Sequence, residues 1–184
     1  MKDIIKIGGK LAIICATAAI ALGLVNAITE PVIEEVKKRR LEEALARVVK
    51  EGQVEEIRTV ERDQIEGYYP VTDSEAEIIG YVVKLIGLGY GGDMHLLANY
   101  APDGTLKDVV LMENKETPGL GKKAENPQYM EMFINAGGGR EIPTRKDMLS
   151  REDADSVTGA TITFMGIANA LKAGSDFIME LERE

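Results

Sequence analysis

An uncharged run near the start of the chain constrains the fold more than any other feature of the sequence. Residues 11–29 (LAIICATAAIALGLVNAIT) form a stretch of 19 positions that contains no Asp, Glu, Lys or Arg. As a helix, this stretch would be about 28 Å long, close to the hydrocarbon thickness of a bilayer. We therefore predict that residues 1–29 form a cytoplasmic start and an uncleaved transmembrane anchor. A buried core helix and a signal peptide cleaved after Val25-Asn26-Ala27 are the alternatives.

The charges that flank this run do not decide its orientation. Lys2, Lys6 and Lys10 precede it, and a second basic cluster, KKRR at residues 37–40, follows it. Positive charge favours the cytoplasmic side, so the two clusters point in opposite directions. The second cluster weighs less, because long soluble domains cross membranes largely regardless of their charge. We expect a cytoplasmic N-terminus, an extracytoplasmic C-terminal domain and a place in the cell (inner) membrane.

Composition excludes several classes of function for the rest of the chain. Residues 30–184 carry 19 basic and 30 acidic side chains, and such an acidic domain is a poor partner for the phosphate backbone of a nucleic acid. The whole chain has one Cys and one His, which excludes a disulfide framework, a Cys-ligated iron–sulfur cluster and a Cys/His zinc site within it. We expect no metal site and no catalytic triad. His95 alternates within a predicted strand, and we interpret it as a structural or surface residue.

Hydrophobic periodicity predicts a connecting helix followed by strands. Residues 30–52 favour an amphipathic connecting helix, because their apolar residues fall on one stripe. Residues 78–88 are rich in β-branched side chains and bounded by glycines, which predicts a buried strand. Two further strands are predicted at residues 94–100 and 105–112, with a hairpin turn at residues 101–104 between them. The N-terminal part of the soluble domain therefore contributes a sheet with antiparallel pairing.

Helical patterns return after the strands. We predict a short helix at residues 127–135, a flexible break at the glycines of residues 137–139, and a long helix from residue 161 to the C-terminus. The last helix carries one buried stripe: Phe164, Ile167, Leu171, Ile178 and Leu181. The fold class is therefore α+β: a single N-terminal transmembrane helix, then a domain at residues 53–184 with an antiparallel-rich sheet flanked by helices.

The motif DSVTGAT at residues 155–161 stands immediately before the last helix. Asp155 or Thr158 is a natural N-cap, and Gly159 and Ala160 leave the first-turn amides accessible. Open amides at a helix N-terminus favour an anion, typically a phosphate, and Thr161 presents a hydroxyl beside that position. An ordinary helix cap without a ligand is the alternative interpretation.

A second motif, ETPGLG at residues 116–121, predicts a tight loop with an exposed backbone. Its residues are Glu116, Thr117, Pro118, Gly119, Leu120 and Gly121. An apolar Leu120 between two glycines suits packing against a flat ring, and Lys122 and Lys123 are the nearest positive charges for a bound anion. An ordinary surface turn after a strand is the alternative interpretation.

Together, the two motifs resemble the FMN-binding domain of membrane redox complexes. The sequence from Asp155 to Thr161 matches the flavinylation signature of that family in full. One N-terminal span before about 150 residues resembles the G subunits of Rnf complexes, and the C subunits of sodium-translocating NADH:quinone reductases are near, usually longer relatives. One departure is visible, because Asn114 stands near a place where the family often has His.

This resemblance implies a covalent flavin. A flavin transferase would esterify the phosphate of FMN to the Thr161 hydroxyl and would recognise the sequence that begins at Asp155. Thr158, Gly159 and Ala160 would lie beside the phosphate, and the loop from Glu116 to Gly121 would pack on the isoalloxazine ring. Lys123 would complete the cofactor-binding residues.

The resemblance also implies a function as an electron carrier in a larger enzyme. The complex would couple electron transfer between ferredoxin and NAD to Na⁺ or H⁺ translocation, and its other subunits and the bilayer would be the partners of this chain. No NAD-binding fingerprint appears, and we interpret the loop at residues 89–92 as one that lies close to the flavin. The alternatives are an anchored extracytoplasmic scaffold without flavin, an isolated flavoprotein reductase, and a C subunit of a sodium-translocating NADH:quinone reductase.

Overall fold

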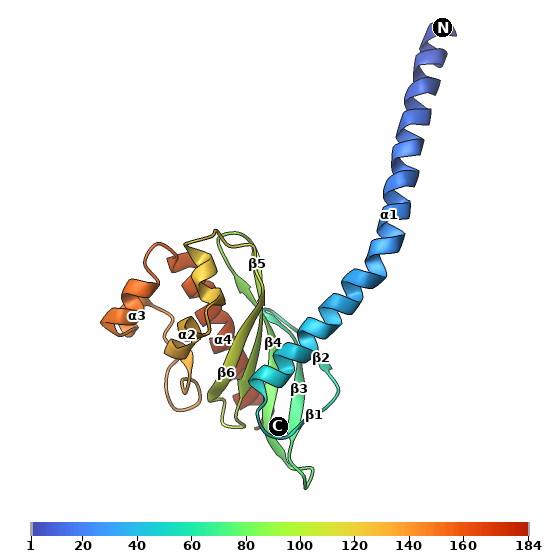
Figure 1. Ribbon diagram of the computed structural model, residues 1–184. Helices are drawn as coiled ribbons and strands as arrows, with labels where there is room; N and C mark the ends of the chain where they lie inside the picture. Colours follow the sequence, from blue (N-terminus) through green and yellow to red (C-terminus); the bar gives the residue numbers. More distant parts are fainter. Residues whose placement is uncertain (1, 184) are drawn as a thin grey trace. The chain divides into compact units, whose positions relative to one another are not determined.

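The computed structural model describes residues 2–183, with side chains from residue 6 onward. The chain divides into two compact units, one up to Leu41 and the other from residue 42 to the C-terminus. The long helix α1 (Lys2–Val48) begins in the first unit and ends in the second (Figure 1).

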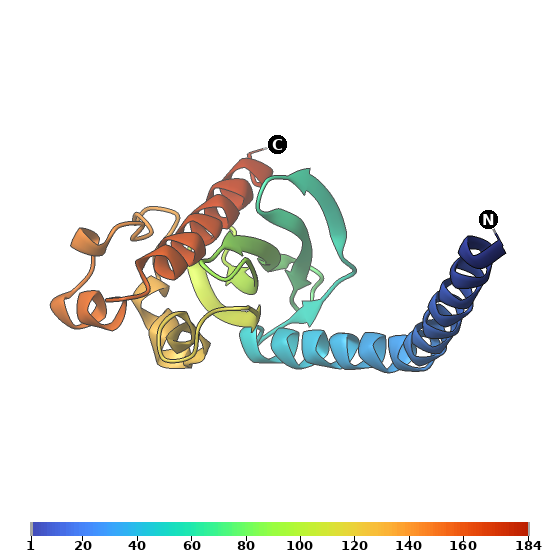
Figure 2. The ribbon, with the colours of Figure 1, turned by 90° about the horizontal axis from the view of Figure 1, so that it is seen from above.

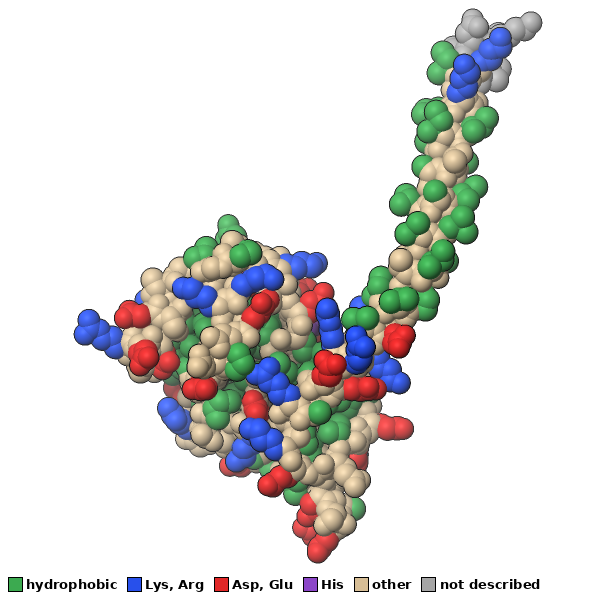
Figure 3. All heavy atoms as spheres, in the orientation of Figure 1, with side chains coloured by type: hydrophobic (Ala, Val, Ile, Leu, Met, Phe, Trp, Pro, Cys, Tyr) green, Lys and Arg blue, Asp and Glu red, His purple; other side chains and the backbone are tan. Residues whose placement is uncertain are grey.

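Within the described residues, α1 is the one helix that is long and apolar enough to cross a membrane. None of its apolar window is buried, and Leu22 and Ile28 are each 71% exposed. Figure 3 shows hydrophobic side chains along much of the helix. This exposure favours a membrane anchor over a buried core helix. The helix continues through Pro31, where the proline removes one backbone donor without ending the helix.

The second unit is built on a six-stranded sheet in which every pairing is antiparallel. Its strands are β1 (Gln53–Val54), β2 (Arg58–Arg62), β3 (Ile65–Thr72), β4 (Ile78–Leu88), β5 (Asp93–Tyr100) and β6 (Leu106–Glu113). They are ordered β1-β3-β4-β5-β6, and β2 also pairs with β3. The three predicted strands are confirmed as β4, β5 and β6, and β1 to β3 are additional to the prediction.

The predicted turn between β5 and β6 is also confirmed. The amide of Gly104 donates to the carbonyl of Ala101 over 2.9 Å, and Gly104 has a φ of +84°, which glycine adopts without strain. The side chain of Asp103 accepts from the amide of Thr105 over 2.9 Å. This hydrogen bond is the main reason why the pKa of Asp103 is lowered.

Short helices connect the sheet to the C-terminal helix. They are η1 (Gly121–Glu125), α2 (Pro127–Met130), η2 (Glu131–Phe133), η3 (Lys146–Met148) and α3 (Arg151–Ser156), and α4 (Thr161–Leu181) follows. The helix predicted at residues 127–135 is shorter than expected, because one α-helical turn passes into a 3₁₀ turn that ends at Phe133.

The prediction of a flexible break at residues 137–139 is wrong. The amide of Gly137 donates to the carbonyl of Arg140 over 2.6 Å, and the amide of Arg140 donates back over 3.0 Å. Gly137 also forms a bridge with Thr105, and a Cβ atom there would lie 2.3 Å from the carbonyl oxygen of Gly104. The glycines permit a tight turn against the neighbouring hairpin rather than a loose linker.

Helix α4 packs across one face of the sheet and builds the main core (Figures 1 and 2). The predicted stripe is buried, since Phe164, Ile167, Leu171 and Ile178 are 0% exposed and Leu181 is half-buried. The hydroxyl of Tyr100 on β5 donates to the carbonyl of Leu171 over 2.8 Å. The α+β fold class is therefore confirmed, and α4 is packed on the sheet with its first turn at one end of it.

Candidate functional site

The two sequence motifs meet at a cleft of about 420 Å³, a volume in the range of small-molecule sites. Its lining residues come from the β4–β5 loop, the segment after β6, and the start of α4: Tyr90, Glu116, Thr117, Leu120, Gly121, Gly159, Ala160, Thr161, Ile162 and Thr163. We call it the Thr161 cleft.

The start of α4 presents an uncapped helix end to this cleft. Ala160 occupies the N-cap position, and no side chain of the described residues accepts a hydrogen bond from the first-turn amides. Thr161, the first residue of the helix, is exposed. Gly159 has a φ of +84°, so it turns the chain sharply into α4. The arrangement therefore offers backbone donors and one hydroxyl at the same position.

The predicted capping of α4 by Asp155 or Thr158 is wrong. Asp155 is exposed and belongs to the preceding helix α3. The Thr158 hydroxyl donates to the carbonyl of Ala154 over 3.0 Å and accepts from Nζ of Lys146 over 2.7 Å. The side chain of Thr158 thus hydrogen-bonds to the C-terminal turn of α3 rather than to the start of α4. The sequence pattern alone did not separate these two helix ends.

Glu116 is buried at the base of the Thr161 cleft and is 4% exposed. Its Oε2 accepts from the hydroxyl of Thr163 over 2.7 Å, and its Oε1 accepts from the amide of Gly91 over 2.9 Å. Its own amide donates to Oδ1 of Asn114 over 3.0 Å. The carboxyl group therefore joins the β4–β5 loop to the first turn of α4.

Asn114, the position at which the sequence departs from the family pattern, organises this segment. It accepts from the amide of Glu116, and its Nδ2 donates to Oε1 of Glu125 over 2.9 Å. The hydrogen bond from Asn114 is the largest cause that holds the pKa of Glu125 below its usual value, and Lys122 adds to it. The side chain thus links the end of β6 to η1.

The loop at residues 117–120 lies against the DSVTGAT motif. Gly119 has a φ of +79°, and the amide of Leu120 donates to the carbonyl of Thr117 over 3.2 Å. Leu120 is 45% exposed, and a Cβ atom on Gly159 would lie 3.3 Å from its Cδ2. Pro118 and Gly119 are exposed and do not line the cleft. Leu120 therefore supplies an apolar wall beside Thr161.

Further apolar side chains surround the cleft. Tyr90, Ile162 and Met165 are exposed to 75, 54 and 44%, and the first two line it. Tyr90 lies in the loop that the sequence placed near a ligand. Ile162 and Met165 were missed, although their position off the buried stripe of α4 was a usable signal. Figure 3 shows hydrophobic side chains at this end of the domain.

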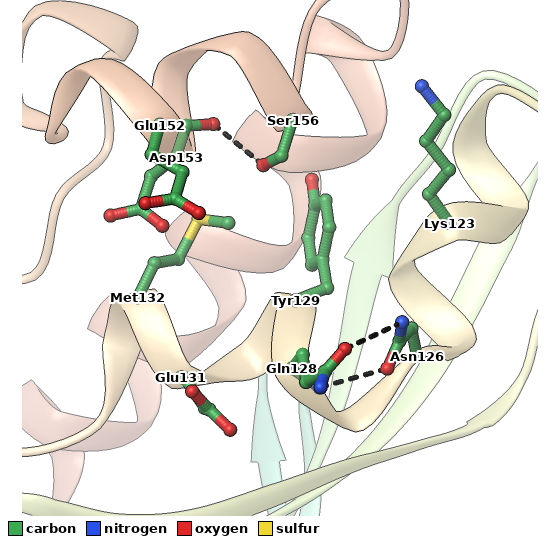
Figure 4. A pocket seen from close by; sticks show the side chains of 9 residues that line it. All are labelled: Lys123, Asn126, Gln128, Tyr129, Glu131, Met132, Glu152, Asp153 and Ser156. Atoms are coloured by element: carbon green, nitrogen blue, oxygen red, sulfur yellow. Dashed lines mark hydrogen bonds between the residues drawn. The ribbon is translucent and has the colours of Figure 1, made fainter.

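Lys123 does not line the Thr161 cleft. It lies on the rim of a second cleft of about 750 Å³, between η1, α2, η2 and α3 (Figure 4). Acidic side chains on its other walls include Glu152 and Asp153. At its base, Tyr129 Oη is the single buried side-chain polar atom that lacks a hydrogen-bond partner in the described part of the chain. Burial raises the pKa of Tyr129 well above its ordinary value.

The other sequence expectations concern His95 and metals. His95 lies on β5 with its Nδ1 3.6 Å from Oε1 of Glu66, and it does not line the Thr161 cleft. Among the residues that the structure describes, no group of three or more His, Cys, Asp or Glu side chains is placed to hold a metal ion.

Comparison with known proteins identifies a domain within this chain. The sequence model of the FMN-binding domain matches residues 89–176, a range that contains every residue of the Thr161 cleft. The chain therefore contains an FMN-binding domain. This match suggests FMN as a ligand class for the cleft, which the geometry alone leaves open.

The relatives of this chain include proteins that match it over nearly its whole length. The G subunit of the ion-translocating oxidoreductase complex of Methanosarcina acetivorans is 26% identical and covers 98% of this chain and 97% of its own. The G subunit of the Na⁺-translocating ferredoxin:NAD⁺ oxidoreductase complex of Acetobacterium woodii is 27% identical, with 99% and 95% covered. The crystal structure of Shewanella oneidensis NqrC is similar with a TM-score of 0.48, 22% identity and 69% of each chain covered.

Proposed function

We propose that this protein is an electron-carrier subunit with FMN covalently bound through its phosphate to the hydroxyl of Thr161. One observation carries the proposal. The exposed Thr161 stands at the uncapped start of α4, on the wall of a cleft that both motifs of the FMN-binding domain build. An ordinary helix cap would use a side chain for the same amides, and α4 has none.

The residues of the cleft fit the two chemically different ends of FMN. A phosphodiester keeps a negative charge, which the first-turn amides and the dipole of α4 favour. The isoalloxazine ring is flat and largely apolar, and exposed Leu120, Ile162 and Tyr90 offer it apolar surface. When bound, FMN supplies transfer of one or two electrons. The chain's own residues bind and orient it, and the covalent bond prevents its loss to solvent.

The proposed place of the protein is in a membrane complex that couples electron transfer between ferredoxin and NAD to translocation of Na⁺ or H⁺. Similarity to the G subunits of such complexes over nearly the whole chain supports this assignment. Helix α1 would anchor the protein, with its N-terminus in the cytoplasm and the FMN-binding domain outside. The partners would be the other subunits of the complex and, during maturation, a flavin transferase for which Asp155 is part of the recognised sequence.

A loss of the Thr161 hydroxyl tests the proposal. We would express the wild type, Thr161→Val and Thr117→Val in a host that carries a flavin transferase, and measure flavin fluorescence of the denatured chains in a gel. Thr117 lines the same cleft, so it controls for a general loss of cleft structure. We expect fluorescence from the wild type and Thr117→Val only. Fluorescence of Thr161→Val would assign the bond to another residue, and a dark wild type would favour an anchored scaffold.

A further inference from the structure

We propose that Glu116 is the positioning residue of the flavin site: its carboxylate clamps the three segments around the Thr161 cleft and places a fixed negative charge beside the bound flavin. The inference rests on the proposed function, and it assigns to Glu116 a role other than direct packing on the ring. Thr163 and Gly91 both donate hydrogen bonds to this side chain.

The hydrogen bonds of Glu116 suit a carboxylate. Both carboxylate oxygens act as acceptors, one from an amide and one from a hydroxyl, so neither is required to carry a proton. No ion pair to Glu116 is found among the residues that the structure describes. A buried charge without a counterion is costly unless it is well hydrogen-bonded, and this one is held by neutral donors. In the proposed site, this carboxylate would therefore carry a charge without a local counterion.

Glycines leave the space that the carboxylate occupies. A Cβ atom on Gly89 would lie 2.2 Å from Oε1 of Glu116, and one on Gly121 would lie 2.1 Å from Oε2. A Cβ atom on Gly91 would lie 2.1 Å from the carbonyl oxygen of Lys115, the residue before Glu116. The β4–β5 loop, the segment after β6 and the first turn of α4 thus close around one side chain. Loss of the carboxylate would release all three from one another.

The charge has a consequence that a purely structural clamp would lack. Each electron that a donor of the complex passes to a bound flavin adds one negative charge unless a proton enters with it. A fixed negative charge on the wall of the same cleft opposes that gain. Glu116 should therefore lower the reduction potential of the flavin.

Two substitutions separate the charge from the clamp. Glu116→Gln keeps the size of the side chain, can accept from Gly91 and can donate to the Thr163 oxygen, so it removes mainly the charge. Thr163→Val keeps the charge and removes one donor. Glu125→Gln is the matched control, because Glu125 is exposed and does not line the cleft.

The measurements use full-length protein matured with a flavin transferase. We would determine FMN on Thr161 by peptide mass and the midpoint potential by redox titration. Glu116→Gln should retain FMN and titrate at a more positive potential than the wild type, whereas Thr163→Val and Glu125→Gln should show no positive shift. An FMN-loaded Glu116→Gln with the wild-type potential, or an equal positive shift in Thr163→Val, would overturn the assignment of a fixed charge.

Hydrogen exchange tests the clamp in a way that does not depend on bound flavin. In Glu116→Ala, hydrogen exchange of the Gly91 amide should be faster by about tenfold or more, because its hydrogen bond is lost. Unchanged exchange would overturn the clamp. A wild type without FMN on Thr161 would contradict the proposed function, and the exchange experiment would still decide the role of Glu116.

Discussion

Replacing Gly166 with alanine should destabilise the FMN-binding domain, because α4 and β4 approach each other backbone to backbone at this residue. A Cβ atom on Gly166 would lie 2.1 Å from the carbonyl oxygen of Leu88 and 3.0 Å from Cε of Met94. A Cβ atom on Gly87 would in turn lie 2.8 Å from the carbonyl oxygen of Gly166. The first clash is with backbone, so a change of side-chain rotamer cannot relieve it.

The magnitude follows from two opposing terms. Overpacking of this kind costs about 3 kcal/mol, at the upper end of the usual range, because helix and strand must separate by about 1 Å. Alanine regains about 1 kcal/mol over glycine through its helix propensity. The free energy of unfolding should therefore fall by about 2 kcal/mol.

Urea unfolding followed by circular dichroism measures this change. Gly139→Ala is the control, because a Cβ atom there has nothing within 4 Å and the residue has no positive φ. We expect the midpoint of Gly166→Ala to fall and the stability of Gly139→Ala to stay within about 0.5 kcal/mol of the wild type. Equal stability of Gly166→Ala and the wild type would refute the close packing of α4 on β4, and with it the placement of Thr161 beside the β4–β5 loop.

Two further predictions concern single side chains of the same domain. Tyr129→Phe removes a buried hydroxyl without a partner, so it should raise the free energy of urea unfolding by about 1 kcal/mol, and a decrease would show that the hydroxyl is satisfied by water. The pKa of Asp103 is lowered in the folded state, so its contribution to stability is complete above the ordinary pKa of about 3.9 and is lost as the pH falls through the lowered value. Asp103→Asn should therefore be less stable than the wild type in urea unfolding at pH 7, and the difference should shrink as the pH is lowered below about 3.9. A difference that stays the same at every pH would contradict the role of the Thr105 hydrogen bond to the ionised carboxylate.

Much of the fold was predictable where one physical signal dominates. The strand at residues 78–88 was found with the bounds that the structure shows, because β-branched residues between glycines favour no other structure. Strands β1 to β3 were missed, since β2 (RTVER) is rich in charge and exposed, and Pro70 interrupts the pattern of β3. Their pairing with one another and with β4, rather than local preference, makes them strands.

The two motifs of the site were predictable from the sequence, but the arrangement of their residues in space was not. Sequence patterns placed Thr161 at the start of a helix and Leu120 on an exposed loop, and both line one cleft. Patterns could not show that Glu116 turns inward, because its donors lie 25 and 47 residues away in the chain. They also placed Lys123 with the cofactor, whereas the 3₁₀ turn of η1 carries it to the neighbouring cleft.

Peptide mass mapping of protein purified from its native membranes tests the central claim most directly. The tryptic peptide that spans residues 152–172 contains Thr161 and the whole DSVTGAT motif. We predict that this peptide carries the mass of FMN minus water and that fragmentation places the addition on Thr161. An unmodified Thr161 in this native material would contradict the covalent electron carrier.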